Sequence, residues 1–307
     1  MEKKEQKGKL LLIDANSLIH RAYHALPPLT NPSGEPSGAL YGLSSVLIKL
    51  LKEKEPIYAA AAFDRPEPTF RKEMYEEYKA TRKPTPDDLI PQIRGSRELV
   101  ESFGIEAIEE PGFEADDIVA TLAAKFKEEV SEVIVISGDL DLLQLVDKKV
   151  IVDVPSRGIS ETKAYREEEV IERFGIEPKY MADYKGLVGD TSDNIPGVRG
   201  IGPKSAEKLI TKYGILEEIY KNINKIEEED KKLAEKLKKN KDQAFLSKKL
   251  AIISTDAPVP LILSKYRIIE DEERLISYFK KMGFETLIKR ISKEEPKEEI
   301  RETGKLF

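Results

Sequence analysis

Three apolar, strand-like runs in the first half of this chain are each followed by an aspartate within three residues. The runs are Leu10–Ile13, Tyr58–Phe63 and Glu132–Ile136, and the aspartates are Asp14, Asp64 and Asp139. Helical patterns separate the runs, and this β-α-β order implies parallel strands. Because the carboxyl ends of parallel strands meet at one edge of a sheet, the aspartates are expected to converge there. The predicted fold class is α/β, with a central, mostly parallel sheet flanked by helices.

Six more acidic residues extend this set in short clusters along the chain. The nine are Asp14, Asp64, Glu114, Asp116, Asp117, Asp139, Asp141, Asp190 and Asp193. Any one cluster also fits a helix cap or a surface position. Together, however, so many converging carboxylates would repel one another unless cations hold them. Oxygen ligands of this kind suit Mg²⁺ or Mn²⁺, so we predict that the nine acids hold two or more such ions.

Two neighbouring divalent ions can clamp a phosphodiester, one generating hydroxide and the other stabilising the leaving oxygen. The acid clusters therefore predict a metal-dependent enzyme that acts on phosphates and leaves a 5′-phosphate. With no cysteine and only two histidines, the chain has no disulfide, zinc-thiolate site or cysteine nucleophile. Little room remains for a Ser-His-Asp triad, so carboxylate chemistry is favoured.

A basic stretch interrupted by prolines covers residues 65–94. It combines Arg71, Lys79 and Arg82 with the aromatic rings of Phe70, Tyr75 and Tyr78. Such a mixture suits the threading of a single nucleic-acid strand by charge and stacking, and we expect a mobile arch over the strand ends. A solvated surface helix with ion pairs is the alternative.

A glycine-rich turn followed by a basic helix lies at residues 196–210, with the sequence PGVRGIGPKSAEKLI. Gly197, Gly200 and Gly202 permit a tight turn whose backbone N–H groups can approach a DNA phosphate. Lys204 and Lys208 add positive charge beside it. The turn is typical of sequence-independent duplex binding, although an ordinary helix-helix turn remains the alternative.

Three segments are expected along the chain. Residues 1–175 form the α/β nuclease core with the arch, residues 176–290 form a helical DNA-binding domain, and residues 291–307 form a charged, flexible tail. No apolar run is long enough to cross a bilayer, and the charged N-terminus lacks a signal-peptide core. We therefore expect a monomer retained in the cytoplasm, without a membrane partner.

The motifs in this order resemble the flap endonuclease family, most closely the 5′ nuclease (5′-3′ exonuclease) domain of bacterial family A DNA polymerases. They are LLIDANSLIHRAYHALP, FDRPEPTFRKEMYEEYKATR, PGFEADD, SGDLDLLQL and GLVGDTSDNIPGVRGIGPKSA, and the resemblance covers roughly residues 8–290. It implies a PIN-like or resolvase-like core and a helix-hairpin-helix-like region. The implied activities are a 5′-3′ exonuclease and a flap endonuclease, acting at branched or nicked DNA and at RNA primers during replication and repair.

The resemblance also implies a role for each acid. Asp14, Asp64, Glu114, Asp116 and Asp139 would hold the more catalytic ion, Asp141, Asp190 and Asp193 the second, with Asp117 near both. Arg71 and Lys79 would steer the scissile phosphate towards the ions, so the implied catalytic residues are Asp14, Asp64, Arg71, Lys79 and Asp139. The glycine-rich turn would grip the duplex and hold a K⁺ ion.

DNA contacts are implied along both halves of the chain. The residues are His20, Arg21, Arg71, Lys79, Arg82, Gly197, Gly200, Gly202, Lys204, Ser205 and Lys208. His20 stands where the family usually has a tyrosine that stacks on a base near the cut, so stacking with a pH dependence is one interpretation. A histidine on a helix face with no such task is the other.

Other functions and partners stay open at this stage. A PIN-like single-strand ribonuclease and a non-catalytic module that binds DNA junctions are the alternatives to the 5′ nuclease. Expected partners are DNA with a 5′ flap, a nick or an RNA primer, and a DNA polymerase. Leu306 and Phe307 also suggest an anchor for a sliding clamp.

Overall fold

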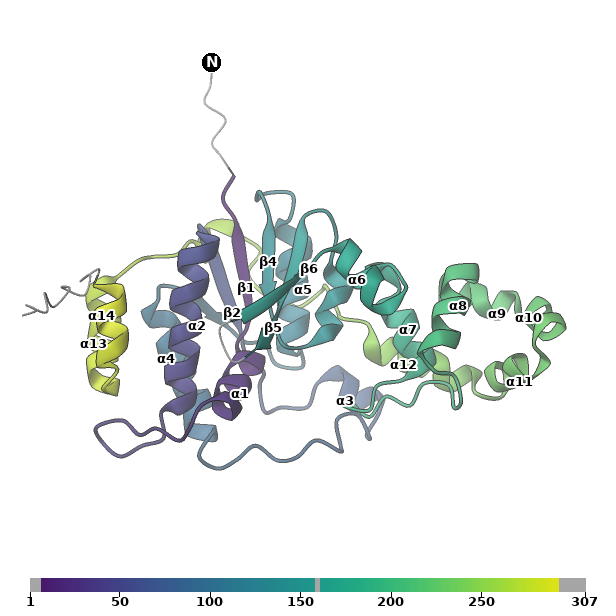
Figure 1. The fold of residues 1–307 in the computed structure, drawn as a ribbon, viewed down its shortest axis with the longest axis horizontal. Coiled ribbons are helices and arrows are strands. Elements are labelled where there is room, and N and C mark those ends of the chain that lie inside the picture. The colour runs from purple at the N-terminus through teal and green to yellow at the C-terminus, as the bar shows by residue number, and fades with distance from the viewer. Residues whose placement is uncertain (1–6, 158–160, 293–307) are drawn as a thin grey trace, which may run out of the picture.

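A six-stranded sheet with helices on both faces forms the centre of the molecule (Figure 1). The computed structural model describes residues 7–157 and 161–292. The strands are β1 (Leu10–Asp14), β2 (Tyr58–Ala62), β3 (Glu106–Ile108), β4 (Val133–Ile136), β5 (Val150–Arg157) and β6 (Glu161–Tyr165). Their order is β3-β2-β1-β4-β5-β6, and only β6 runs antiparallel to its neighbour. The predicted α/β class and mostly parallel sheet are confirmed.

Helices fill the connections and the second half of the chain. Those around the sheet are α1 (Ala15–Ala25), α2 (Gly38–Lys54), α3 (Phe70–Met74), α4 (Ile90–Ser102), α5 (Ala115–Phe126), the 3₁₀ helix η1 (Leu140–Leu145) and α6 (Glu167–Phe174). The later ones are η2 (Pro178–Tyr180), α7 (Met181–Val188), α8 (Pro203–Tyr213), α9 (Leu216–Lys221), α10 (Ile223–Glu229), α11 (Lys231–Lys239), α12 (Lys241–Ala251), η3 (Leu263–Tyr266), α13 (Glu272–Met282) and α14 (Glu285–Ile291).

The central strands are apolar throughout because both faces of the sheet are covered. In β1, Leu11 and Ile13 face the cluster built with α1, α2 and α4, whereas Leu10 and Leu12 face the cluster built with α5. All four side chains are fully buried. Alternation along the strand thus fixes its register, since a slip of one residue would exchange the two faces.

Several helices of the second half differ from the sequence pattern. The continuous charged pattern of residues 227–239 belongs to two helices, α10 and α11, because Asp230 caps the second by accepting the Leu233 N–H at 3.0 Å. Helices α12 and α14 and strand β6 were not predicted. Strand β6 lies at the sheet edge with mostly exposed or half-buried residues, so it lacks the apolar pattern of the central strands.

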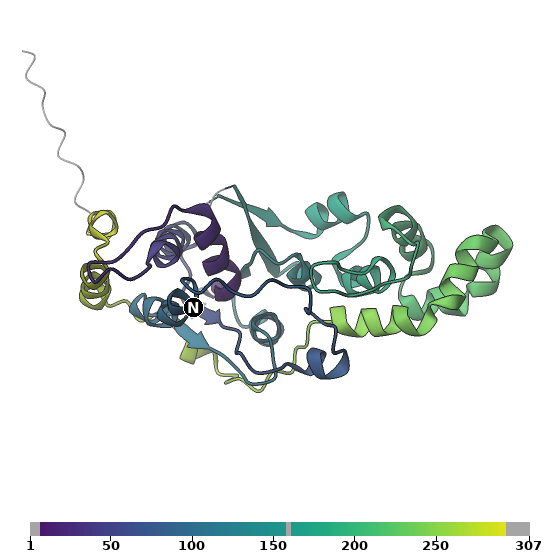
Figure 2. The same cartoon turned by 90° about the horizontal axis from the view of Figure 1, so that it is seen from below.

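The last two helices, α13 and α14, lie against the α/β core again, after the helical region of the second half. Helices α8 to α11 lie at one end of the molecule and α13 and α14 at the other, as Figures 1 and 2 show. Helices α13 and α14 pack against α4 and α2, and Phe279 and Leu287 are fully buried there. Residues 272–291 therefore pack with the core, although the sequence placed them in the helical domain. Most of the expected tail, including Leu306 and Phe307, lies outside the described residues.

The expected arch is docked on the helical region in this structure. Tyr78 is 4% exposed and packs with Ala182, Ile195 and Leu250, while the Phe70 ring contacts Phe113. The predicted stacking role is therefore wrong for Tyr78 in this conformation, because its ring buries apolar area inside the protein. Phe70 and Tyr75 are half-buried, and Lys79 and Arg82 line the cavity at the strand ends, so the arch over these ends stays a prediction. None of the helices in the described ranges is both long and apolar enough to span a membrane.

Candidate active site

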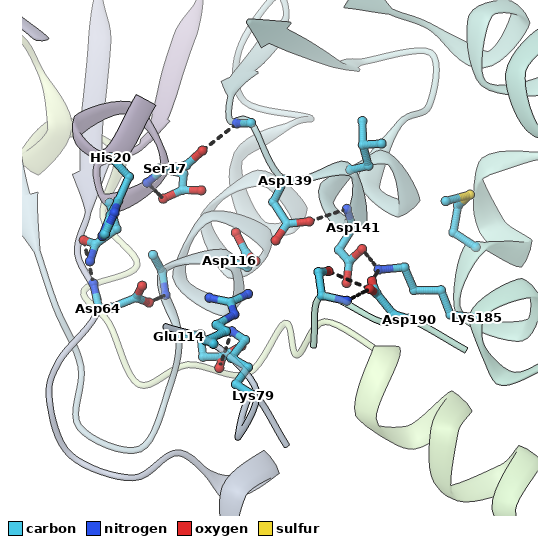
Figure 3. Close-up of a pocket in the computed structure, with 18 of the residues that line it drawn as sticks. Ser17, His20, Asp64, Lys79, Glu114, Asp116, Asp139, Asp141, Lys185 and Asp190 are labelled. Atoms are coloured by element: carbon cyan, nitrogen blue, oxygen red, sulfur yellow. Dashed lines mark hydrogen bonds and ion pairs between the residues drawn. The ribbon is translucent and has the colours of Figure 1, made fainter. Parts of the chain in front are cut away.

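A cavity of about 760 Å³ lies at the carboxyl ends of β1, β2 and β4, bounded also by α5 and α7. Seven of the nine predicted acids line it (Figure 3): Asp14, Asp64, Glu114, Asp116, Asp139, Asp141 and Asp190. They come from five separate segments, so the parallel topology brings together residues that are far apart in the sequence. Asp117 and Asp193 do not line the cavity.

Backbone and hydroxyl donors hold Asp14 and Asp139 in place. Asp14 caps α1 by accepting the Ser17 N–H at 3.0 Å, and its other oxygen accepts from the Ser137 hydroxyl at 2.6 Å. The Ser137 hydroxyl oxygen in turn accepts the Asp139 N–H at 2.9 Å. One serine at the end of β4 therefore orients both aspartates.

Asp64 and the first turn of α5 form the next part of the wall. The Asp64 carboxylate accepts the Ala115 N–H at the start of α5 at 2.8 Å, where the helix dipole favours negative charge. The backbone N–H of Asp64 donates to Asn16 at 3.1 Å. Beside them, the Oδ1 atom of Asp116 is buried and has no hydrogen-bond partner among the described residues.

The acids raise one another's pKa. Burial, and then repulsion from Asp64, raise the pKa of Asp14 to about 7 despite its hydrogen bonds. Burial and repulsion from neighbouring aspartates, Asp14 first, also raise the pKa of Asp116 well above its ordinary value. Burial raises the pKa of Asp139 as well. A bound cation would relieve this repulsion, and the oxygen donors of this part of the cavity fit a hard divalent cation.

The carboxylates stand apart from one another in this arrangement. No three histidine, aspartate or glutamate side chains in the described ranges come close enough together to enclose an ion by themselves. Lysines and arginines instead pair with five of the nine acids: Arg71 with Asp117 at 2.7 Å and with Glu114 at 3.1 Å, Lys79 with Glu114 at 2.8 Å, Arg82 with Asp193 at 2.5 Å, and Lys185 with Asp141 and Asp190. The described basic side chains form no ion pair with Asp14, Asp64, Asp116 or Asp139.

Arg71 is buried away from the cavity, contrary to its expected contact with DNA. Only 2% exposed, its guanidinium donates to Asp117 and Glu114 and to the carbonyl oxygens of Leu250 and Ile252. These bonds use all five N–H donors, so none is left for a phosphate. The predicted steering role is therefore wrong for this conformation, in which Arg71 joins α5 to the end of α12.

Asp117 likewise has a structural position rather than the expected one between two ions. Its side chain is fully buried, pairs with Arg71 at 2.7 Å and accepts the Ser254 N–H at 2.8 Å. It also completes a capping box with Glu114 at the start of α5. The three-residue spacing of Glu114 and Asp117 reflects this cap, because a capping box needs an acceptor side chain at the N-cap and at the third helical position.

The glycine-rich turn combines a buried half with an exposed half. Gly197 is buried, its N–H donates to Ser247 and its carbonyl oxygen accepts from Gln243. The predicted contact of Gly197 with DNA is therefore wrong for this conformation. A side chain there would lie 2.3 Å from the Gly189 nitrogen. The other predicted contacts, Gly200, Gly202, Lys204, Ser205 and Lys208, are exposed or half-buried at the start of α8.

His20 and Arg21 occupy different positions on α1. His20 is half-buried and lines the cavity beside Asp64, as Figure 3 shows. Burial, together with repulsion from His24, lowers the pKa of His20, so its ring is neutral at pH 7. Arg21 does not line the cavity.

Sequence reasoning missed the residues that support the acids. Ser17 and Ser137 donate to the Asp14 carboxylate, Asn16 accepts the backbone N–H of Asp64, and Lys185 pairs with Asp141 and Asp190. Ser137 directly follows β4, and Asn16 and Ser17 lie in the first turn of α1, where polar residues are common. Lys185 has no such signal, since only the packing of α7 against η1 brings it to Asp141.

Without divalent ions, the protein is expected to lose stability as the pH rises from about 4 to about 8. Asp14 binds its proton more tightly when folded, since its pKa is about 7 against 3.8 as the ordinary value. This stabilisation is complete at pH values below the ordinary pKa of 3.8, and it is lost as the pH rises through the folded-state pKa of about 7. Melting temperatures in a chelator should therefore fall across this range, and saturating Mg²⁺ should remove the trend. A chelator profile that stays flat or rises would contradict it.

Comparison with known proteins identifies the chain. Residues 9–175 match the family model for the N-terminal, resolvase-like domain of 5′-3′ exonucleases, and residues 176–274 match its C-terminal SAM fold. The matched fold, with its acid-lined cavity at the strand ends, is that of a nuclease. The chain belongs to the 5′-3′ exonuclease family.

Bacterial DNA polymerases I are similar to the chain over almost its whole length. The protein from Caldicellulosiruptor bescii is 45% identical over 286 residues, 92% of this chain. That from Bacillus caldotenax is 44% identical over 294 residues, 95% of this chain. Each match covers 33% of the relative, so the chain spans about a third of the length of these proteins.

Solved structures share the fold at low sequence identity. T5 5′-exonuclease with bound zinc ions matches with a TM-score of 0.69 and 22% identity, over 90% of this chain and 98% of that one. The catalytic core of Rad2 in complex with DNA substrate matches with a TM-score of 0.58 and 21% identity, over 90% of this chain and 88% of that one. The predicted resolvase-like core and helical second region are confirmed by these matches.

Proposed function

We propose that this chain is a divalent-metal-dependent, structure-specific 5′ nuclease. It acts as a 5′-3′ exonuclease and flap endonuclease on branched or nicked DNA and removes RNA primers in replication and repair. The cavity carboxylates at the strand ends that have no ion pair with the described lysines and arginines carry this proposal, because binding DNA requires no such acids. The DNA complex of Rad2 and the metal complex of T5 5′-exonuclease support it by analogy of fold.

Mg²⁺ or Mn²⁺ is the cofactor that the donor set fits best, since all the cavity acids offer oxygen. Asp14, Asp64, Asp116 and Asp139 would hold one ion, and Asp141 with Asp190 would hold a second. When bound, such ions supply hydroxide at neutral pH and stabilise the leaving oxygen. The protein orients Asp14 through Ser137 and Asp64 through the N-terminus of α5.

Two basic surfaces flank the cavity and are proposed to position DNA. Lys79 and Arg82 lie on its wall, where they would have to leave Glu114 and Asp193 to contact a phosphate. Outside the cavity lining, Lys204 and Lys208 are exposed in the first half of α8, near the helix N-terminus, whose dipole favours an anion. A K⁺ ion held by the same turn is part of the proposal.

Cleavage of a 5′-flapped duplex is the direct test. We expect products with 5′-phosphates in Mg²⁺, none in a chelator, and at least a thousandfold slower cleavage by Asp139→Ala, about 4 kcal/mol of lost transition-state stabilisation. Duplex binding by this variant should stay within a fewfold of the unchanged protein. Undiminished cleavage by Asp139→Ala would contradict the proposal.

Parallel assays separate the alternatives. Faster cleavage of single-stranded RNA than of the flap would favour a PIN-like ribonuclease, and binding of junctions without turnover in Mn²⁺ would favour a non-catalytic module. Cooperation with a DNA polymerase is proposed from the DNA polymerase I relatives, of which the matched part is a third. A monomeric state and a sliding-clamp contact through Leu306 and Phe307 remain proposals, and the latter residues lie outside the described ranges.

A further inference from the structure

Lys185 lies between two carboxylates of the cavity (Figure 3). It extends from the last turn of α7, and its ammonium contacts Asp141 and, at 2.5 Å, Asp190. All three side chains are largely buried, with exposed fractions of 13%, 12% and 16%. A buried lysine that bridges two acids places one positive charge where a divalent ion would otherwise lie.

The cavity therefore has two parts with different electrostatics. Asp14, Asp64, Asp116 and Asp139, here called the unpaired quartet, have no ion pair with the described lysines and arginines. Asp141 and Asp190, here called the bridged pair, share Lys185. Burial alone would raise the pKa of Asp190, but Lys185 and Ser192 lower it to about 2. Asp190 is thus charged, and the Lys185 ammonium already neutralises part of the charge of the bridged pair.

We propose that Lys185 is a counter-ion for the bridged pair, which a second divalent ion must displace, so that the ions bind in order. The first ion enters the unpaired quartet, where no described lysine or arginine forms an ion pair, and the second binds only when the ammonium leaves. This inference rests on the proposed function. It assigns Lys185 a positioning role, since the side chain acts through Asp141 and Asp190.

The chemistry of lysine suits this exchange. A flexible four-carbon stem carries a strongly hydrated point charge, which can leave two carboxylates and return to water more readily than a fixed guanidinium fork. Lys185 also lines the cavity, so a path to solvent is open beside it. Because linkage is reciprocal, an ion whose binding weakens the contacts of Lys185 must itself bind less tightly while those contacts are present.

Removing only the charge tests this linkage. In Lys185→Met the bridged pair loses its counter-ion, so the metal-free protein should melt at a lower temperature. The second ion should then bind on the order of tenfold more tightly, within the usual range of coupling between two ligands. Saturating Mg²⁺ should consequently raise the melting temperature of Lys185→Met more than that of the unchanged protein.

Lys248→Met is a matched control elsewhere in the fold. Lys248 bridges Asp183 at 2.7 Å and Glu217 at 2.6 Å, and its exposed fraction of 14% nearly equals that of Lys185. It does not line the cavity. Loss of its charge should lower the melting temperature in a chelator and in Mg²⁺ alike, and ion binding should stay unchanged.

The experiment is a calorimetric titration of Mn²⁺ and Mg²⁺ into the metal-free chain, with melting temperatures measured in parallel. Tighter binding of one ion in Lys185→Met, with the control unchanged, supports the proposal. Unchanged or weaker binding in Lys185→Met would overturn it and mark Lys185 as a structural support. If the unchanged protein binds no divalent ion, the proposed function fails as well, so the two failures are distinguishable.

Discussion

Asp116→Asn is expected to make the metal-free protein more stable and to abolish its activity. The carboxylate is buried among like charges, with an oxygen that has no partner in the described ranges. A neutral amide of the same shape removes this repulsion and can donate a hydrogen bond to a neighbouring carboxylate. Cleavage of the flapped duplex should fall by about a thousandfold or more if Asp116 holds the first ion as proposed, because a ligand of that ion is then lost.

The stability change should be visible in thermal unfolding with a chelator present. A gain of 1 kcal/mol corresponds to roughly 2–4 °C for chains of about this size, so an increase of a few degrees is expected. In Mg²⁺ the advantage should shrink or reverse, since the unchanged protein then gains more from its ions. Asp256→Asn is the control, because Asp256 is exposed and outside the cavity. A lower melting temperature for Asp116→Asn than for this control would contradict the assignment.

Residues that directly follow a strand could be placed from the sequence alone. Asp14, Asp64 and Asp139 end or follow β1, β2 and β4, and parallel pairing brings the ends of these strands to one edge. Apolar runs identify the strands, and topology then fixes where their ends meet. The acids of the cavity therefore follow from local patterns plus one rule of sheet geometry.

Roles that depend on packing between distant segments could not be placed in this way. Arg71 is basic and lies in a proline-rich stretch, which suggests a solvated surface, yet it is buried against residues about 180 positions later in the chain. Gly197 differs from Gly200 in the same turn only because α12 covers one of them. Lys185 reaches its partners through the contact of α7 with η1. Spacing along the sequence carries no information about such contacts.

Arg71→Met is expected to cause the largest loss of stability of the substitutions considered. It leaves the fully buried Asp117 without a cationic partner, while Glu114 keeps only Lys79, and it also removes two donors from backbone carbonyl oxygens. Breaking a buried ion pair by removing one partner costs about 3–5 kcal/mol, because the remaining charge is uncompensated. The free energy of unfolding, measured with urea, should fall by this amount.

Arg82→Met is the control from the same segment. The Arg82 side chain is 48% exposed and pairs only with Asp193 among the described acids, so its loss should cost about 1 kcal/mol or less. Hydrogen exchange locates the effect, since Arg71→Met should also expose the Ser254 amide, which donates to Asp117. Equal losses of unfolding free energy in the two variants would show that the contacts of Arg71 with α5 and the end of α12 do not contribute specially to stability. A large loss of stability confined to Arg71→Met would show that this arginine stabilises the fold, although its basic, proline-rich segment suggested a contact with DNA.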